Sequence, residues 1–165
     1  MLGVDRETGE RVANGKYKFA IPSAPVAPHF ITADVTAPLD LARETDGIFV
    51  LGGDIAVLDA RDGAPRLTVH GFGRGRAVYL SGFKFNFENT RLLHRALFWA
   101  ASRDAAWGAW QSANVKTEAT YFAKAAKLVV INNAGTDERT TVTLADGKTR
   151  RTLDVPAHGI RIVDV

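Results

Sequence analysis

The alternation of apolar and polar positions is clearest between residues 48 and 81, where it predicts a small antiparallel sheet. Ile48–Leu51 is an apolar run followed by two glycines, a pattern typical of a buried strand. Asp62-Gly63 interrupts the alternation and favours a hairpin, because glycine accepts the positive φ that tight turns require. We therefore expect a three-stranded antiparallel meander with strands at Ile55–Ala60, Arg66–Gly71 and Arg76–Ser81.

The period changes in "NTRLLHRALFWAAS", where apolar residues recur at helical spacing and predict a buried helix with Arg91 and Arg95 on its other side. Asn89 is the expected N-cap, because its side-chain oxygen can accept a backbone N–H of the first turn. Upstream, "APLDLARETDG" (residues 37–47) predicts a short helix or helical turn. Short strands are expected at Tyr17–Ile21 and Phe30–Ala33.

Beyond residue 104 the pattern consists almost entirely of short strands. Turn sequences such as "NNAGTD", "ADGK" and "PAHG" separate them, and this arrangement predicts a small all-β sandwich. The expected strands are Val115–Phe122, Lys127–Asn132, Arg139–Leu144, Arg150–Val155 and Ile160–Val165. We therefore predict an α/β domain over residues 1–104 and a C-terminal β-sandwich over residues 105–165.

The sequence "GFGRG" (residues 71–75) has the glycine spacing of a phosphate-binding loop. Such a loop requires a helix directly after the glycines, so that helix N–H groups point at the anion. Here the glycines lie between two predicted strands, and no P-loop pattern follows. We interpret the run as a hairpin turn, with Arg74 and Arg76 as solvated flanking charges.

The loop between the last meander strand and the helix is a better candidate for a polar site, because α/β folds commonly place ligands there. Lys84, Asn86 and Asn89 are the candidate ligand-binding residues. Six cations and one anion, Glu88, occupy residues 66–95, and this imbalance favours an anionic ligand or an acidic partner. The alternative is a loop that caps the helix and holds an interface between domains. The cations are Arg66, Arg74, Arg76, Lys84, Arg91 and Arg95.

Composition narrows the remaining functions of these 165 residues. Apolar residues make up 46% and charged residues 24%, and the net charge of +3 comes from 21 cations and 18 anions, which disfavours nucleic-acid binding. No apolar run reaches the length of a membrane span, and the polar N-terminus lacks a signal-peptide pattern, so we expect a cytoplasmic protein. The sequence has no cysteine, and its four histidines lie far apart, so we predict no metal site, no cofactor and no catalytic residue.

Several stretches resemble one enzyme family. "GVDRETGERV", "HFITAD", "RAVYLSGF", "NTRLLHRALFWAA" and "VVINNAGTDERTTVTLADGK" are similar to the C-terminal third of the 1,3-β-galactosyl-N-acetylhexosamine phosphorylases, also called galacto-N-biose/lacto-N-biose phosphorylases. More loosely, "VLDARDGAPRLTVHGFGRGRAVYL" resembles the end of the amidotransferase-like trimerisation domain of certain β-galactosidases. The resemblance implies a partial amidotransferase-like domain followed by the sandwich.

The family resemblance also implies a function. Its members use inorganic phosphate to cleave β-1,3-galactosyl-N-acetylhexosamines to galactose 1-phosphate with inversion, and the catalytic acid belongs to an N-terminal barrel that 165 residues cannot include. The chain would then provide scaffold and oligomer contacts, with the rest of the phosphorylase polypeptide or a second copy as partner and sugar and phosphate as candidate ligands. Exposed apolar surface at Ile48–Leu51 and around Phe98 and Trp99 would favour a dimer. The alternative function is a stand-alone carbohydrate-binding or interaction module that uses Trp107 and Trp110 to stack on a sugar.

Overall fold

The structure, a computed structural model, describes residues 2–6, 28–42 and 47–165 of the chain. Its residues form two compact units, Met1–Asp104 and Ala105–Val165, which we describe separately. Over the described ranges the secondary structure is mostly strand, in several small sheets, with a single α-helix. That helix and the shorter helical turns of these ranges do not have the length and apolar character needed to cross a bilayer.

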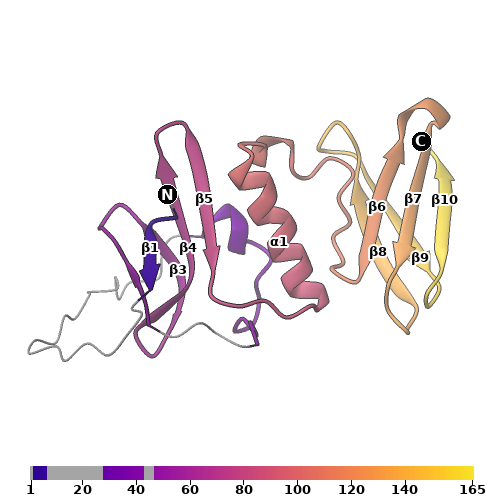
Figure 1. Ribbon diagram of the computed structural model, residues 1–165. Helices are drawn as coiled ribbons and strands as arrows, with labels where there is room; N and C mark the ends of the chain where they lie inside the picture. Colours follow the sequence, from indigo (N-terminus) through magenta and orange to yellow (C-terminus); the bar gives the residue numbers. More distant parts are fainter. Residues whose placement is uncertain (1, 7–27, 43–46) are drawn as a thin grey trace, which may run out of the picture. The chain divides into compact units, whose positions relative to one another are not determined.

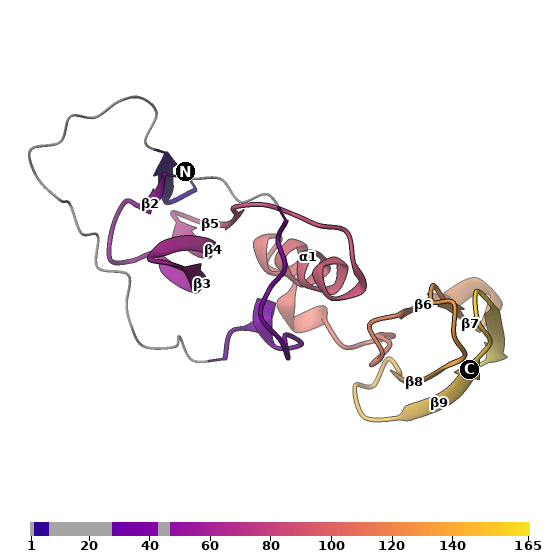
Figure 2. The same ribbon diagram turned by 90° about the horizontal axis from the view of Figure 1, so that it is seen from below.

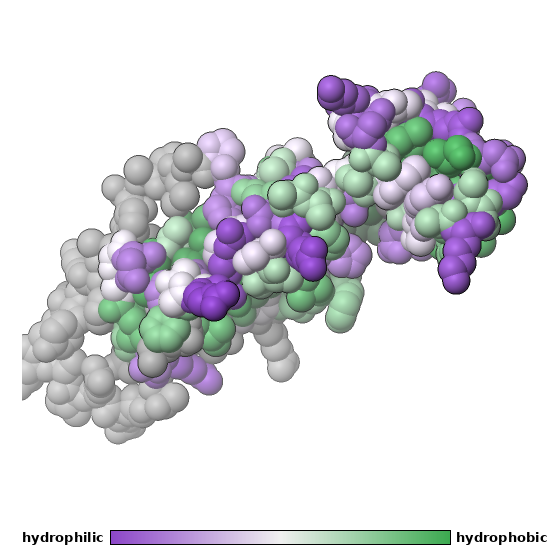
Figure 3. Space-filling model, turned by 90° about the horizontal axis from the view of Figure 1, so that it is seen from above, coloured by the Kyte–Doolittle hydropathy of each residue, from purple (hydrophilic) through white to green (hydrophobic). Residues whose placement is uncertain are grey.

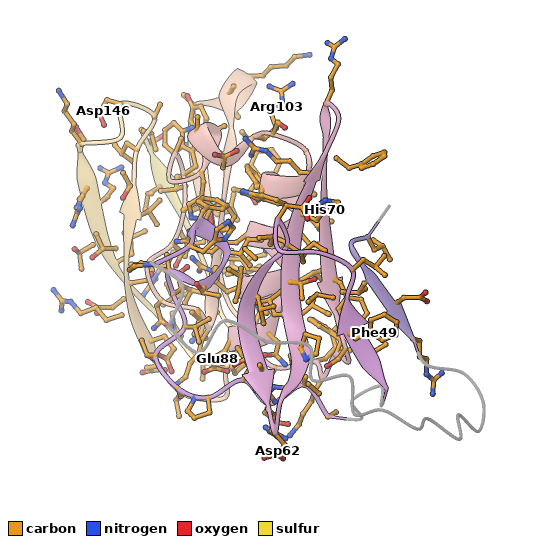
Figure 4. The ribbon with its side chains drawn as sticks, turned by 90° about the vertical axis from the view of Figure 1, so that its left-hand side faces the viewer. Phe49, Asp62, His70, Glu88, Arg103 and Asp146 are labelled. Atoms are coloured by element: carbon orange, nitrogen blue, oxygen red, sulfur yellow. The ribbon has the colours of Figure 1, made fainter. Side chains whose placement is uncertain are left out.

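The N-terminal unit is built on a three-stranded antiparallel sheet. Its order is β3-β4-β5, which confirms the predicted meander. At the β3–β4 turn Asp62 and Gly63 have φ of 50° and 82°, so the turn adopts the left-handed conformation that glycine favours. Figure 4 shows Asp62 at the tip of this hairpin. The strands are β3 (Ala56–Arg61), β4 (Ala64–Phe72) and β5 (Gly75–Leu80).

One face of this sheet packs against helix α1 (Phe87–Ala100). Leu67 and Val69 of β4 meet Leu92 and Ala96 of α1 in one core, where each of these side chains is at most 5% exposed. Full burial of such an aliphatic side chain is worth roughly 1.5–3 kcal/mol. The register of the sheet is therefore fixed by which residues of β4 face the helix.

The other face of the sheet carries the two-stranded ladder of β1 (Val4–Arg6) and β2 (Ile48–Val50). Figure 2 shows the sheet between this ladder and α1. Gly3 lies against the ring of His70 on β4, where an added Cβ would come within 3.0 Å of Nδ1. Strand β2 is half-buried at all three of its residues and not fully buried as the sequence predicted.

Two predictions upstream of the sheet are wrong over the described residues. Phe30–Ala33 is not a strand: Phe30–Thr32 form a 3₁₀ turn, η1, whose first N–H groups are capped by His29. No helix forms over residues 37–42, where Leu39 and Leu41 instead insert into the core as isolated apolar side chains. The predicted strand at Tyr17–Ile21 and residues 43–46, in the second half of the predicted helix, lie outside the described residues.

The C-terminal unit consists of two antiparallel sheets, β10-β7-β6 and β8-β9, that share one core (Figures 1 and 2). All five predicted strands are confirmed, with ends that shift by at most two residues. Leu128, Val130, Val142 and Val155 fill the core and are at most 1% exposed. The strands are β6 (Thr117–Phe122), β7 (Lys127–Asn132), β8 (Glu138–Thr143), β9 (Arg150–Val155) and β10 (Ile160–Asp164).

Buried polar groups hold the loops of this unit to its strands. The side-chain nitrogen of Asn132, Nδ2, lies within hydrogen-bonding distance of three backbone oxygens, those of Thr136 at 2.7 Å, Val155 at 3.1 Å and Pro156 at 3.0 Å, which share its two hydrogens. Its side-chain oxygen accepts the N–H of Ala134 at 2.9 Å. A single side chain, 1% exposed, thus ties the end of β9 and the loop after it to the loop that follows β7.

Candidate functional site

The predicted ligand loop follows β5 and leads into α1. Helix α1 begins at Phe87, and its N-cap is Asn86, whose side-chain oxygen accepts the backbone N–H of Asn89 at 2.7 Å. Our prediction that Asn89 caps the helix is therefore wrong by one turn. Both asparagines suit a cap by residue type, and the burial of Asn89 in the first turn decides between them.

Asn89 holds two separate segments of chain together. Its side-chain nitrogen donates to the carbonyl oxygens of Asp40 and Lys84, both at 2.8 Å, and the residue is 1% exposed. Both hydrogens of the amide are used in these two bonds. Asn89 therefore fastens the segment before Leu41 to the loop before α1.

Lys84 takes part in the same junction through its side chain. Its ammonium group lies 2.6 Å from a carboxylate oxygen of Asp40, and both side chains are more than half exposed. The hydrogen bond from Lys84 holds the pKa of Asp40 below its usual range. Lys84, Asn86 and Asn89 are thus brought together as predicted for a site, but the bonds described here serve the junction between the two segments.

Basic residues of this region form ion pairs with acidic residues that lie far from them in the sequence. Arg95, predicted on the outer side of α1, is only 9% exposed and makes a two-point ion pair with Asp34 at 2.6 and 3.0 Å. It also donates to the carbonyl of Phe30 at 2.9 Å, which ties α1 to the η1 turn. A bidentate arginine–carboxylate pair is a strong and directional contact. The sequence analysis missed Asp34 as the partner of Arg95, because 61 residues separate the two.

Arg66 and Arg76 also form ion pairs with aspartates. The guanidinium of Arg66 lies 2.7 Å from Asp59, and that of Arg76 lies 2.7 Å from Asp104. The hydrogen bond from Arg76 also lowers the pKa of Asp104. Arg76 is therefore not the solvated flanking charge that we predicted. The local excess of cations in the sequence is largely neutralised by carboxylates from elsewhere in the fold.

The glycine run forms the turn between β4 and β5, as predicted. Gly73 has φ of 58° and requires the left-handed conformation, whereas Gly71 and Gly75 pair with Arg76 and Phe72 in the ladder. The next element after the turn is a strand, so no helix N-terminus points at the glycines. This geometry lacks the helix N–H groups on which a phosphate-binding loop depends.

A pocket of about 220 Å³ opens beside the start of α1. Asp34, Asp40 and Glu88 line it together with Asn86, Asn89 and residues 35–39. Two of these three carboxylates are already paired with cations. Three of the residues that line the pocket are acids, so an anion such as phosphate does not suit it.

The two tryptophans proposed as a sugar platform are both half-buried. Trp110 stacks on Tyr121 with ring centroids 3.9 Å apart and planes 11° from parallel, and it packs against the core of the C-terminal unit. One face of its indole is thus already covered by another ring. In the described ranges, moreover, no group of three or more histidine, cysteine, aspartate or glutamate side chains is arranged to hold a metal ion.

Both units are similar to domains of one known protein family. A family model described as the lacto-N-biose phosphorylase central domain matches residues 1–105, and one described as the lacto-N-biose phosphorylase C-terminal domain matches residues 110–163. The chain belongs to the lacto-N-biose phosphorylase family. The resemblance on which the sequence-based identification rested is therefore confirmed.

Individual relatives agree with this assignment. A 1,3-beta-galactosyl-N-acetylhexosamine phosphorylase of Bifidobacterium longum is 35% identical over 193 residues, covering 97% of this chain and 25% of that protein. A D-galactosyl-beta-1->4-L-rhamnose phosphorylase of Lachnoclostridium phytofermentans is 32% identical over 161 residues, covering 95% of this chain and 20% of that protein. The chain thus spans a quarter or less of the length of these curated relatives.

Proposed function

We propose that this chain is a non-catalytic C-terminal portion of an inverting disaccharide phosphorylase. The parent reaction would use phosphate to cleave a β-1,3-galactosyl-N-acetylhexosamine and give galactose 1-phosphate. In this role the chain contributes scaffold and oligomer contacts, while the groups that protonate the leaving sugar and bind phosphate belong to the remainder of the polypeptide.

The main support for the proposal is that the polar residues predicted to bind a ligand form hydrogen bonds and ion pairs within the chain itself. Asn89 spans two backbone segments, Asn86 caps α1, and Lys84 pairs with Asp40. An inverting phosphorylase needs a carboxylic acid placed opposite a bound phosphate. The pocket beside α1 is lined by acidic residues, but the cations near it are already paired with carboxylates. It therefore does not favour the binding of phosphate.

The relatives supply a second, independent support. Two proteins whose names specify different linkages and different acceptor sugars match this chain about equally well, at 35% and 32% identity. A region that selected the acceptor would be expected to differ between them. The similarity is more readily explained if this portion serves a structural purpose that is common to both activities.

The amidotransferase-like assignment of the N-terminal unit belongs to the same proposal. The β3-β4-β5 meander followed by α1 fits the end of such a domain, in which a hairpin precedes a strand and a covering helix. The chain lacks cysteine, so it has no thiol nucleophile of the amidotransferase type. We therefore propose this likeness for the architecture alone.

The decisive experiment mixes the purified 165-residue chain with phosphate and lacto-N-biose and measures galactose 1-phosphate. The Bifidobacterium longum relative, assayed in parallel, is the positive control. We expect no product from the chain alone. Turnover that survives further purification and is lost on Asp34→Asn or Glu88→Gln would overturn the proposal.

Calorimetry separates the proposal from the carbohydrate-binding alternative. Galactose, N-acetylglucosamine and N-acetylgalactosamine would be titrated into the chain and into a Trp107→Ala variant. We expect no saturable heat in either case. Saturable binding that depends on Trp107 would favour the binding module.

A further inference from the structure

The sheet β10-β7-β6 of the C-terminal unit has one face in the core and one face directed away from it. Leu128 and Val130 of β7 point into the core, so Val129 and Ile131, which alternate with them, lie on the outer face. The antiparallel register places Ile160 beside Ile131 and Ile162 beside Val129. Neighbouring strands therefore bring four branched apolar side chains together on the outer face.

This outer patch, defined as Val129, Ile131, Ile160, Ile162 and Phe122, is unusually exposed for its composition. Ile131 is 38% exposed, Phe122 54%, Ile160 57% and Ile162 64%. Figure 3 shows apolar side chains at the surface of this unit among hydrophilic ones. A contiguous apolar patch with a polar rim is typical of an interaction surface, whereas scattered single residues are not.

Charged side chains at the margin direct the contact to the face of the sheet and not to its edge. Lys127 of β7 pairs with Asp164 of the edge strand β10, directly beside Phe122 in the register. Arg161, in the middle of β10, donates to the backbone oxygen of Asp154 at 3.0 Å. Charges on an edge strand oppose the addition of a further strand. The apolar rows of the outer patch remain available for docking by side chains.

We infer that the outer patch docks against the part of the phosphorylase polypeptide that this chain does not match. The inference rests on the proposed scaffold role and names the surface that performs it. The chain covers 25% of the Bifidobacterium longum relative, so the other 75% of such a polypeptide is available as an occupant. A contact partner within the same polypeptide has a high effective concentration and needs only a modest interface.

The size of the outer patch supports this occupant over a second copy of the chain. At roughly 200 Å² for a large side chain, the exposures of its four most open residues give on the order of 400 Å² of apolar surface. A stable complex of separate chains buries roughly 800 Å² on each partner. Contacts between domains of one chain start at a smaller area, roughly 300 Å² per side.

The test uses a fusion in which this chain replaces the matched quarter of the Bifidobacterium longum relative. Hydroxyl-radical footprinting, which reports side-chain exposure to solvent, compares Ile131, Ile160 and Ile162 in the fusion and in the isolated chain. Sedimentation velocity gives the oligomeric state of both proteins. Ile162→Lys is the test variant, Ile162→Ser is a milder one, and Thr152→Lys on the exposed side of β9 is the matched control.

We expect oxidation of the three isoleucines to fall several-fold in the fusion. Ile162→Lys should restore the oxidation of the two remaining isoleucines, Ile131 and Ile160, and lower the melting temperature of the fusion by several degrees, with a smaller shift for Ile162→Ser and none for Thr152→Lys. In the isolated chain Ile162→Lys and Thr152→Lys should have similar, small effects, because both side chains already face water.

Two results would overturn the inference. In one, the isoleucines are oxidised equally in the folded fusion and the isolated chain. In the other, the isolated chain is a dimer that Ile162→Lys makes monomeric, so that a second copy is the occupant. A folded fusion without phosphorylase activity counts against the proposed function, while its footprint still decides the docking surface. A fusion that does not fold counts against both.

Discussion

The side chain of Asn89 provides the sharpest test of whether the loop before α1 is structural or ligand-binding. Asn89→Ala removes two hydrogen bonds of 2.8 Å, to the carbonyls of Asp40 and Lys84, at a position that is 1% exposed. A hydrogen bond of this kind contributes about 1 kcal/mol net, and a buried carbonyl left without a donor costs more. We therefore expect the free energy of opening of the N-terminal unit to fall by about 2–3 kcal/mol. That is a large share of the roughly 5–15 kcal/mol that stabilises a whole protein.

Hydrogen exchange of the α1 amides, followed by mass spectrometry, measures this loss separately from the C-terminal unit. Lys84→Met is the matched control, because it removes a contact in the same junction whose two partners are more than half exposed. An exposed ion pair is worth about 1 kcal/mol or less, so the control should change α1 exchange little. The reasoning is refuted if Asn89→Ala and Lys84→Met have equal effects. It is also refuted if galactose or phosphate slows α1 exchange in the wild-type chain but not in Asn89→Ala.

Two further predictions concern the C-terminal unit. Asn132→Ala should lower its free energy of unfolding by about 2–4 kcal/mol, because the side-chain contacts with the end of β9 and with two loops are lost at a buried position. Asn133→Ala, at the exposed neighbouring position, should cost far less in the same urea titration, and equal midpoints would contradict this account. Hydrogen bonds lower the pKa of Glu138 from 4.5 to about 2, and the bond from Lys116 has the largest effect. The contribution of Glu138 to stability is therefore present above pH 4.5 and is lost as the pH falls toward 2. Thermal melts across this range should show a weaker pH dependence for Glu138→Gln than for the wild-type chain, and parallel curves would contradict the assignment.

Local sequence patterns predicted most of the strands because the signals that define them are local. The meander and the five C-terminal strands follow from period-two alternation and from turn residues such as Asp62-Gly63, whose φ values of 50° and 82° agree with the expected hairpin. The glycine run was likewise assigned to a turn from its position between two strands. The ends of these strands were predicted to within two residues because a turn of this kind permits few registers.

The errors occurred where distant contacts override local preference. Phe30 forms part of a 3₁₀ turn because the buried guanidinium of Arg95 binds its carbonyl and lies 4.9 Å from its ring. The cap of α1 is Asn86 and not Asn89, because packing in the first turn uses Asn89 to join two segments. No pattern within a few residues of Phe30 or Asn89 contains this information.

The sequence by itself determined most of the strands, where most turns lie and to which enzyme family the chain is similar, because alternation, turn chemistry and motif are properties of neighbouring residues. Only the tertiary structure decided which acid neutralises each cation and which candidate site residues are committed to internal bonds. It also decided which apolar side chains stay in water: Val130 and Ile131 are adjacent in β7, yet one is fully buried and the other 38% exposed. The physical reason is that ion pairs and burial depend on residues brought together across the fold, such as Asp34 and Arg95, and no local signal specifies those neighbours.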